Sequence, residues 1–295
     1  MLLVDAGNAL FETTYTTDAK SRPKAELILK TMGELKTAAM AAGARDLTMG
    51  PEFLAQTARK AGVPVLSANL TKDGKLIFPA STVVTVAGVK VALLGISPTI
   101  EHLDRYPGVH ADPPVKAALA EAARLRGKAD LVVALAAIPL ADALQLAKEG
   151  GTLFDFIVQS SESRGLGTMQ RNDRGFLLSA GERGRGMGAL EIDLSAPGDV
   201  PLVDMAEVDR AAQRRRNLEM QADSVKARLA TEKDPGVKKS FEQALASFQD
   251  QLQQLKKESW EEKAKGAHTV HLFMHYLDSN FADDPETKAQ VDRLQ

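Results

Sequence analysis

The sequence predicts an α/β fold that carries an additional pair of long helices. Apolar, β-branched segments alternate with segments of helical period along residues 1–194, as in sheets whose strands are joined by helices. Residues 90–96 are almost wholly apolar, which is typical of a strand buried on both faces. Residues 208–263 then become rich in Ala, Gln, Glu, Lys and Arg and repeat in heptads, which indicates a coiled coil.

Composition excludes several classes of protein. The chain has 295 residues, 44% of them hydrophobic, which suits one main domain with an appendage. A formal net charge of -2 gives no electrostatic basis for binding nucleic acid or an acidic membrane. The absence of cysteine excludes disulfides and thiolate metal sites. The sequence predicts no transmembrane segment, and its start lacks the basic-then-apolar order of a signal peptide.

The first elements follow from periodicity and turn residues. Met1–Asn8 is expected to be a strand that runs into a tight turn. Apolar residues at helical spacing predict a helix over Lys24–Ala42, with Gly43 at its C-terminus. A short strand over Asp46–Met49 should follow, and Pro51 then suits the first turn of a helix that runs to Lys60.

The middle of the chain carries most of the predicted sheet. We expect strands where short apolar or β-branched runs are bounded by turn residues, and a helix where the apolar period lengthens. From residue 175 to 194, Gly-rich turns between short strands suggest an antiparallel end to the sheet. The other expected elements are strands at Val63–Leu66, Ser81–Val86, Lys90–Ile96, Asp130–Ala136 and Phe154–Gln159, and a helix at Ile138–Glu149.

Two heptad-patterned arms predict an antiparallel coiled-coil helical hairpin. The arms are Val208–Thr231 and Val237–Lys263, and Asp234-Pro235-Gly236 should form the turn between them. Each arm has one apolar seam, so the hairpin can be self-contained, or it can offer its flank or tip to a protein partner or to another copy. The seam residues are Ala211, Arg215, Leu218, Ala222, Val225 and Leu229 on the first arm, and Phe241, Leu245, Phe248, Leu252 and Leu255 on the second.

The domain division follows from these patterns. We expect a main domain over 1–200, the hairpin over 201–266, and a strand-helix segment over 267–295. In the last segment, alternation predicts a strand over His268–Leu277, and Asp284-Pro285 should begin a helix that runs to Gln295. A lone strand is unstable, so this segment should pack on the main domain or on the base of the hairpin.

The segment from Ser67-Ala68-Asn69 to Gly88-Val-Lys-Val-Ala-Leu-Leu-Gly-Ile-Ser-Pro98 resembles the catalytic domain of the 5'-nucleotidases, which are calcineurin-like metallophosphoesterases. The resemblance covers roughly residues 1–195. It implies a four-layer α/β/β/α sandwich and a site with two divalent metal ions of the Mn, Zn or Mg type, where a bridging hydroxide attacks phosphorus. It also favours the periplasm or cell envelope as the location.

The metal-ligand motifs of this family are altered in the present sequence. Family members have Asp-Ala-Gly-Asp where this chain has Asp5-Ala6-Gly7-Asn8, so Asn8 replaces a bridging carboxylate. The resemblance aligns Gly-Asn-His-Glu-Phe with Gly50-Pro51-Glu52-Phe53, which retains Gly50 and Glu52 and lacks the Asn and His ligands. The expected upstream unit with an Asp-x-His motif has no counterpart, so the chain is either a fragment or begins one unit late.

The two remaining motifs are altered in the same way. Ala137 stands where Leu-Ser-His-Leu-Gly would supply an imidazole, and Ser161 and Ser163 stand where Gly-His-Ser-His would supply two more. Neutral side chains bind a pair of hard dications poorly. The sequence therefore predicts a vestigial cleft, no cofactor and a non-catalytic binding or scaffold protein that acts through its hairpin. The alternative is an active phosphoester hydrolase whose ligands come from an upstream segment or another arrangement.

Two further groups of residues are candidate sites. Glu52, Asp155 and Glu162 could form an acidic pair in the cleft, although surface carboxylates near strand ends more often begin helices. The imidazoles of His268, His271 and His275 could bind a metal if the segment were helical. On a strand, His271 and His275 share a face and His268 points to the other, so the three imidazoles would not converge.

Overall fold

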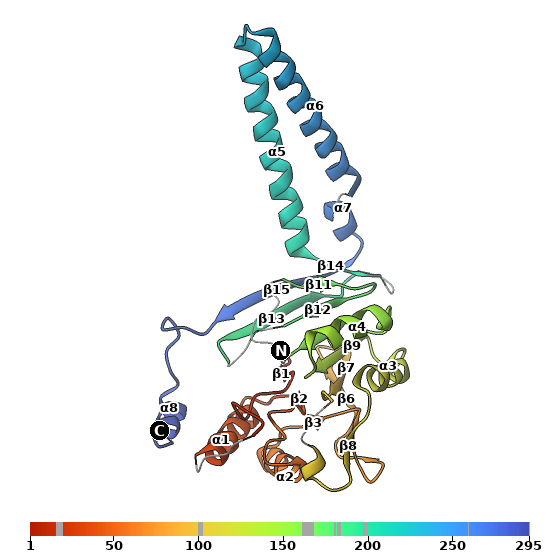
Figure 1. Ribbon diagram of the computed structural model, residues 1–295, viewed down its shortest axis with the longest axis vertical. Coiled ribbons are helices and arrows are strands. Elements are labelled where there is room, and N and C mark those ends of the chain that lie inside the picture. The colour runs from red at the N-terminus through yellow and green to blue at the C-terminus, as the bar shows by residue number, and fades with distance from the viewer. Residues whose placement is uncertain are drawn as a thin grey trace. The chain divides into compact units, whose positions relative to one another are not determined.

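The computed structural model describes residues 1–15, 20–99, 103–160, 168–179, 181, 184–196, 200–258 and 260–294 (Figure 1). The chain forms two compact units. The first comprises residues 1–189 together with 274–295, and the second comprises residues 190–273. Each unit is described in turn.

A six-stranded mixed sheet is the largest element of the first unit. Its parallel centre consists of β7 (Val89–Ile96), β9 (Leu131–Ala136), β10 (Phe156–Gln159) and β12 (Phe176–Leu178). The strand order is β11-β12-β10-β9-β7-β6, with β6 (Ser81–Val86) and β11 (Gln170–Arg171) antiparallel to their neighbours at the two edges. The strands predicted between residues 81 and 159 are therefore confirmed. The expected antiparallel end is short, because β13 (Gly186–Asp193) belongs to another sheet.

Two helices cover one face of this sheet. They are α3 (Pro114–Leu125), which periodicity did not reveal, and α4 (Leu140–Gly150), which was predicted. Ala118, Ala122 and Leu146 from these helices form one apolar cluster with Leu94 and Ala134 of the sheet, and all five are fully buried. The opposite face of β7 is buried as well, since Leu93 is inaccessible. The interpretation of residues 90–96 as a doubly covered strand is thus confirmed.

A smaller parallel sheet contains β1 (Val4–Asp5), β2 (Ala39–Ala41) and β3 (Val65–Leu66). Its apolar side chains share a second cluster with α1 (Ser21–Glu34) and α2 (Pro51–Ala61), and β2 and β3 contact β7 of the large sheet. A further three-stranded sheet has the order β5-β4-β8, from β4 (Leu70–Lys72), β5 (Lys75–Leu76) and β8 (Val109–Ala111), and the 3-10 helix η1 spans Leu103–Arg105.

Gly95 explains the close contact between β3 and β7. A Cβ atom at Gly95 would lie 2.2 Å from the carbonyl oxygen of Leu66, so no larger residue fits. The neighbouring Ser67-Ala68-Asn69 segment is tied to the end of β7 by buried hydrogen bonds. Ser97 N donates to Asn69 Oδ1 (2.9 Å), and Asn69 Nδ2 donates to the carbonyl oxygens of Ser97 (2.8 Å) and Asp112 (3.0 Å). This segment, which carries the family resemblance, is a structural junction.

Two predictions for the N-terminal third were wrong. The helix expected over Lys24–Ala42 ends at Glu34, and residues 39–41 form β2. Lys36 adopts a left-handed conformation (φ 57°) that stops the helix, and the small side chains that follow are inaccessible between two layers. The strand expected over Asp46–Met49 is a turn that joins β2 to α2.

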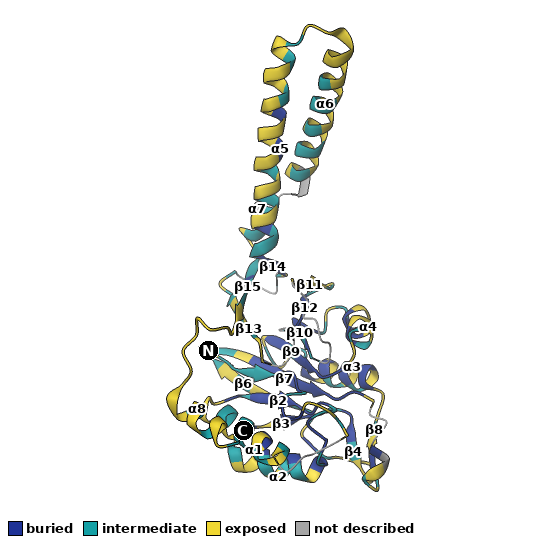
Figure 2. Ribbon diagram, turned by 60° about the vertical axis from the view of Figure 1, so that its left-hand side comes forward, coloured by how far each residue is buried: buried dark blue, intermediate teal, exposed yellow. Residues whose placement is uncertain are grey.

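The second unit contains the long helices. Figure 1 shows α5 (Met205–Thr231) and α6 (Pro235–Glu258) side by side, which confirms the predicted helix pair. Every predicted seam position is buried or half-buried in the structure, whereas most positions between them are exposed (Figure 2). Pro235 and Gly236 lie in the first turn of α6 and not in the turn between the helices. Asp234 caps that helix by accepting from the backbone N–H of Gly236 (2.7 Å) and Val237 (3.0 Å).

The C-terminal elements follow a short helix, α7 (Trp260–Ala264). The strand predicted from His268 is confirmed as β15 (His268–Tyr276), the central strand of a sheet with the order β13-β15-β14, where β14 spans Leu202–Asp204. The predicted C-terminal helix is α8 (Pro285–Asp292), and Gln290 accepts a hydrogen bond from Lys30 of α1 (2.7 Å). No helix in the described ranges is long and apolar enough to cross a membrane.

Candidate active-site cleft

Four chain segments meet at the carboxyl ends of the parallel strands. Asn8 lies just after β1, the turn of residues 42–49 follows β2, Ala137 follows β9 and Ser160 follows β10. In open α/β sheets this edge is where ligand-binding residues gather. The structure therefore brings two of the sequence-predicted residues, Asn8 and Ala137, to the edge where a site would form.

The side chain of Asn8 contacts protein groups on both sides. Its Oδ1 atom accepts from the backbone N–H of Arg45 (3.1 Å), and its Nδ2 atom donates to Ser160 Oγ (3.4 Å). The Ser160 hydroxyl in turn donates to the carbonyl oxygen of Ala6 (2.6 Å). Direct hydrogen bonds thus join the end of β1 to the end of β10, and they occupy the polar atoms of both side chains.

Asp46 is a buried carboxylate that sequence analysis did not single out. It is inaccessible to solvent and accepts from the backbone N–H groups of Asn8 (2.7 Å), Gly43 (2.9 Å) and Leu10 (3.0 Å). Burial raises the pKa of Asp46, and these hydrogen bonds oppose that effect. The carboxylate is directed at the backbone of two loops, so its role is structural.

Asp5 is a second acid close to Asp46. Its Oδ1 atom accepts from the backbone N–H of Gly7 (2.7 Å). Burial and the charge of Asp46 raise the pKa of Asp5 to about 6, above the usual range for an aspartate. The tight turn of residues 5–8 is the sequence feature that places Asp5 beside Asn8.

Gly50 and Glu52 lie at the start of α2 and have structural partners. A Cβ atom at Gly50 would lie 2.8 Å from the ring of Tyr106, so this ring covers the glycine, and φ is +92° there. Glu52 is exposed and pairs with Lys72 (2.6 Å); hydrogen bonding from Lys72 lowers the pKa of Glu52. The adjoining cavity has about 10 Å³, space for one water at most, and is lined by Thr14, Ala44, Leu47, Thr48, Leu103, Arg105 and Tyr106.

Among the remaining predicted cleft residues, those that the structure describes have no side chain that could bind a metal ion. Ala137 is inaccessible, and its backbone N–H donates to the carbonyl oxygen of Ile96 (3.0 Å). A Cβ atom at Gly7 would lie 3.0 Å from Ala137 Cβ, so no imidazole fits between these segments. Ser161, Glu162 and Ser163 lie outside the described residues.

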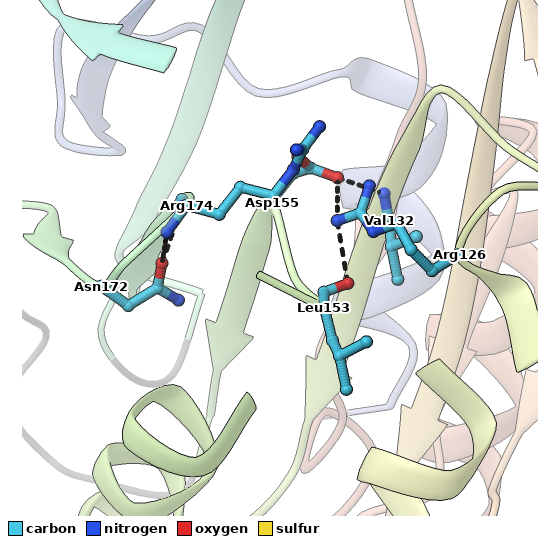
Figure 3. A network of polar contacts seen from close by, with 7 residues as sticks. Arg126, Val132, Leu153, Asp155, Asn172 and Arg174 are labelled. Atoms are coloured by element: carbon cyan, nitrogen blue, oxygen red, sulfur yellow. Dashed lines mark hydrogen bonds and ion pairs between the residues drawn. The ribbon is translucent and has the colours of Figure 1, made fainter. Parts of the chain in front are cut away.

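Asp155 is not part of this cleft, contrary to the acidic-pair interpretation. It precedes β10, whereas Ser160 follows it, so the two residues lie at opposite ends of the strand. Figure 3 shows its carboxylate between two arginines: Oδ1 accepts from Arg174 Nε (2.7 Å) and Oδ2 from Arg126 Nη2 (2.9 Å). Oδ2 also accepts from the backbone N–H of Val132 (2.7 Å), and Arg126 Nη2 donates to the carbonyl oxygen of Leu153 (2.9 Å). This ion-pair network holds the loops together at the amino ends of β9, β10 and β12.

The histidine segment is a strand, so the helical arrangement that would align its three imidazoles does not occur. The ring of His271 contacts that of Phe273, with centroids 4.0 Å apart, and His275 is exposed. Nowhere in the described ranges do three or more His, Cys, Asp or Glu side chains form a group that could hold a metal ion.

Comparisons with solved structures reveal the same fold in phosphoesterases. The calcineurin-like phosphoesterase YfkN from Bacillus subtilis matches 99% of this chain over 82% of its own, with 15% identity and a TM-score of 0.59. Sulfate thiohydrolase SoxB and a 5'-nucleotidase precursor, both from Thermus thermophilus, each match 65% of this chain with 18% and 22% identity and TM-scores of 0.55 and 0.51. The matches cover 35% and 41% of those two proteins. No protein-family model matches the sequence, and no curated protein matches it.

Proposed function

We propose that this chain is a non-catalytic member of the 5'-nucleotidase type of metallophosphoesterase, with a four-layer α/β/β/α domain that positions a helical hairpin for binding. The fold likeness is the premise, since the structural matches are to phosphoesterases at low identity. The observation that carries the proposal is the pair of hydrogen bonds that join Arg45 N to Asn8 and Asn8 to Ser160. At these positions, where the family has metal ligands, polar groups of the protein form hydrogen bonds with one another.

The observed position of β2 improves the comparison with the family motifs. Because β2 ends at Ala41, the segment after it is Gly43-Ala44-Arg45-Asp46-Leu47. We infer that this segment, and not Gly50–Phe53, corresponds to Gly-Asn-His-Glu-Phe. Ala44 then replaces the Asn ligand and Arg45 replaces the His. A guanidinium is cationic at every physiological pH, so this replacement disfavours metal binding more than a neutral residue would.

The donor chemistry of the described cleft does not fit two metal ions. Two divalent cations need several carboxylate or imidazole ligands to replace their hydration shells. The positions after the four strands hold an amide side chain, a turn that contains an arginine, an alanine and a serine. The buried Asp46 carboxylate already accepts hydrogen bonds from three backbone N–H groups.

Metal content and turnover test this proposal. Purified protein equilibrated with Mn²⁺ should retain no stoichiometric metal after desalting, and it should hydrolyse neither 5'-AMP nor p-nitrophenyl phosphate above a blank. The control is Asn8→Asp, which restores one carboxylate and should still give no turnover because Ala44 and Ala137 remain. Two bound equivalents with turnover in the natural sequence would overturn the proposal and favour an active hydrolase.

The hairpin is the proposed recognition element for a protein partner or a second copy. Its two helices pack against each other along one apolar seam. Their outer faces carry exposed charged side chains such as Arg214 and Arg216. Replacing residues 208–263 by a short Gly-Ser linker should remove partners that the full chain captures. An unchanged set of partners would exclude this role for the hairpin without bearing on catalysis.

A further inference from the structure

Strand β6 is an open edge with the features of a pairing surface. It lies at the end of the six-stranded sheet, and β7 is its neighbour on one side only among the described strands. Its ladder with β7 runs from Ser81↔Leu94 to Val86↔Val89 without a bulge. Its sequence, STVVTV, contains no charge and no proline, and Val83 is 46% exposed. Figure 2 shows β6 in the intermediate and exposed colours at the margin of the sheet.

The other described edges are protected in ways that β6 is not. Proteins block unwanted strand pairing with short edge strands, charged side chains, prolines and bulges. Here β1, β3, β5 and β11 have two residues each, and β8 and β14 have three. The long edge strand β13 carries Glu191 and Asp193. Only β6, among the described edge strands, is both long and free of charge.

We propose that β6 pairs with β6 of a second copy of this chain, antiparallel about a two-fold axis, so that the large sheet continues across a dimer. The axis constrains the chemistry of such an edge. Near it, each side chain meets the same or a nearby residue of the other copy, so a charged residue would face a like charge. An edge strand without charges avoids this repulsion. A partner of different sequence would not require the edge to be uncharged, because it could supply the opposite charge.

The register of the pair follows from the β6–β7 turn. Ala87 (φ 50°) and Gly88 (φ 86°) form a two-residue turn, which makes Val86 and Val89 a hydrogen-bonded pair. Alternation then leaves the backbone groups of Ser81, Val83 and Thr85 directed outward. The outward N–H and C=O groups of these three residues can all form hydrogen bonds with the other copy in one register. In that register Val83 lies on the two-fold axis, opposite Val83 of the other copy, and Ser81 lies opposite Thr85.

The charged side chains beside the strand lie next to its two ends. Glu121 and Arg124 of α3 both bond the Ser81 hydroxyl at one end of β6. Lys90 of β7 is exposed and pairs with Thr85 at the other end, on the same face of the sheet as Ser81. The two-fold axis would bring Lys90 of each copy toward the Glu121–Arg124 ion pair of the other, whose two charges cancel, so the uncharged strand and its register carry the proposal.

Cysteine cross-linking tests the register, since the natural chain has no cysteine. In the proposed dimer the Cα atoms of the two copies of residue 83 lie about 5.5 Å apart, within reach of a disulfide. Val83→Cys should form a covalent dimer on mild oxidation. The matched control is Thr85→Cys, which is exposed on the same face but lies about 14 Å from its counterpart because its partner is Ser81. Equal cross-linking of both variants would contradict the two-fold register.

Light scattering after size-exclusion chromatography tests the dimer itself. The full chain should be dimeric, and Val83→Lys should raise the dissociation constant at least about tenfold by placing like charges across the axis. Leu144→Lys, on α4 and 44% exposed, is the control for an added surface lysine and should remain dimeric. A monomer at every concentration, or a dimer that Val83→Lys leaves unchanged, would overturn the proposal.

Discussion

At the scale of single residues, polar side chains at the carboxyl ends of the parallel strands stabilise loops. Hydrogen bonds join the side chains of Asn8, Asp46 and Ser160 to one another or to backbone N–H and C=O groups. An unpaired buried polar group is costly, so the polar side chains at this edge of the sheet need partners within the protein. The contact between Asn8 and Ser160 supplies one such partner.

The carboxyl of Asp5 predicts a pH dependence. The folded state holds its proton up to a pH of about 6, whereas the unfolded chain, with a pKa of 3.8, loses it earlier. The stability of the natural chain should therefore fall as pH rises from about 4 to about 6. Asp5→Asn should be more stable than the natural chain at pH 7.5, by at most about 3 kcal/mol, and this advantage should vanish near pH 4.

Urea unfolding at both pH values measures this difference. The control is Asp112→Asn, because Asp112 is an exposed aspartate whose replacement should shift stability little at either pH. A pH-independent effect of Asp5→Asn would show that ionisation of Asp5 does not oppose folding.

Asp155 predicts a large structural effect remote from the cleft. Its side chain is 2% exposed and compensates the partly buried guanidiniums of Arg126 and Arg174. Asp155→Ala should lower the free energy of unfolding by about 3 to 5 kcal/mol, because two cations lose their partner. The matched control is Glu52→Ala, which breaks an exposed ion pair with Lys72 and should change the urea midpoint little. Equal effects of the two variants would argue against the network.

At the scale of elements, the heptad pattern predicts the helix pair, whereas the sequence places the turn between the helices one or two residues too late. The pattern placed Leu218 and Ala222 on the seam, and both are buried in the structure. Pro235 suits a turn between helices, but proline also suits the first turn of a helix, which is where the structure places it. The Asp234 cap resolves this ambiguity, because its side chain bonds the N–H groups of residues 236 and 237.

The seam predicts a contrast between two positions on α5. Leu218→Asp buries a carboxylate between the helices and should destabilise the hairpin by about 3 kcal/mol, with loss of helical signal on mild heating. Met220→Asp, two residues away and 64% exposed, should leave the helical signal unchanged. Circular dichroism at 222 nm compares the two variants, and similar losses would contradict the assigned seam.

At the scale of the whole molecule, the two apolar clusters both belong to the first compact unit. Neither cluster includes a residue beyond Leu177, so both clusters are formed by residues of this unit. Replacing residues 208–263 by a short linker should leave the melting temperature of the remaining domain within about 3 °C of the corresponding transition in the full chain. Calorimetry measures this, and loss of that transition would show that the hairpin is needed for folding.

The sequence by itself determined the α/β class, the strands from Ser81 to Gln159 and the helix pair, because these features depend on local periodicity. It could not locate β2, since Ala39-Met40-Ala41 consists of apolar residues that also favour a helix, and only burial between two layers makes that segment a strand. The position of β2 also determines which residues line the cleft. Once β2 is fixed, Arg45 and Asp46 come beside Asn8 across 37 and 38 residues, and pairings at that range depend on tertiary packing.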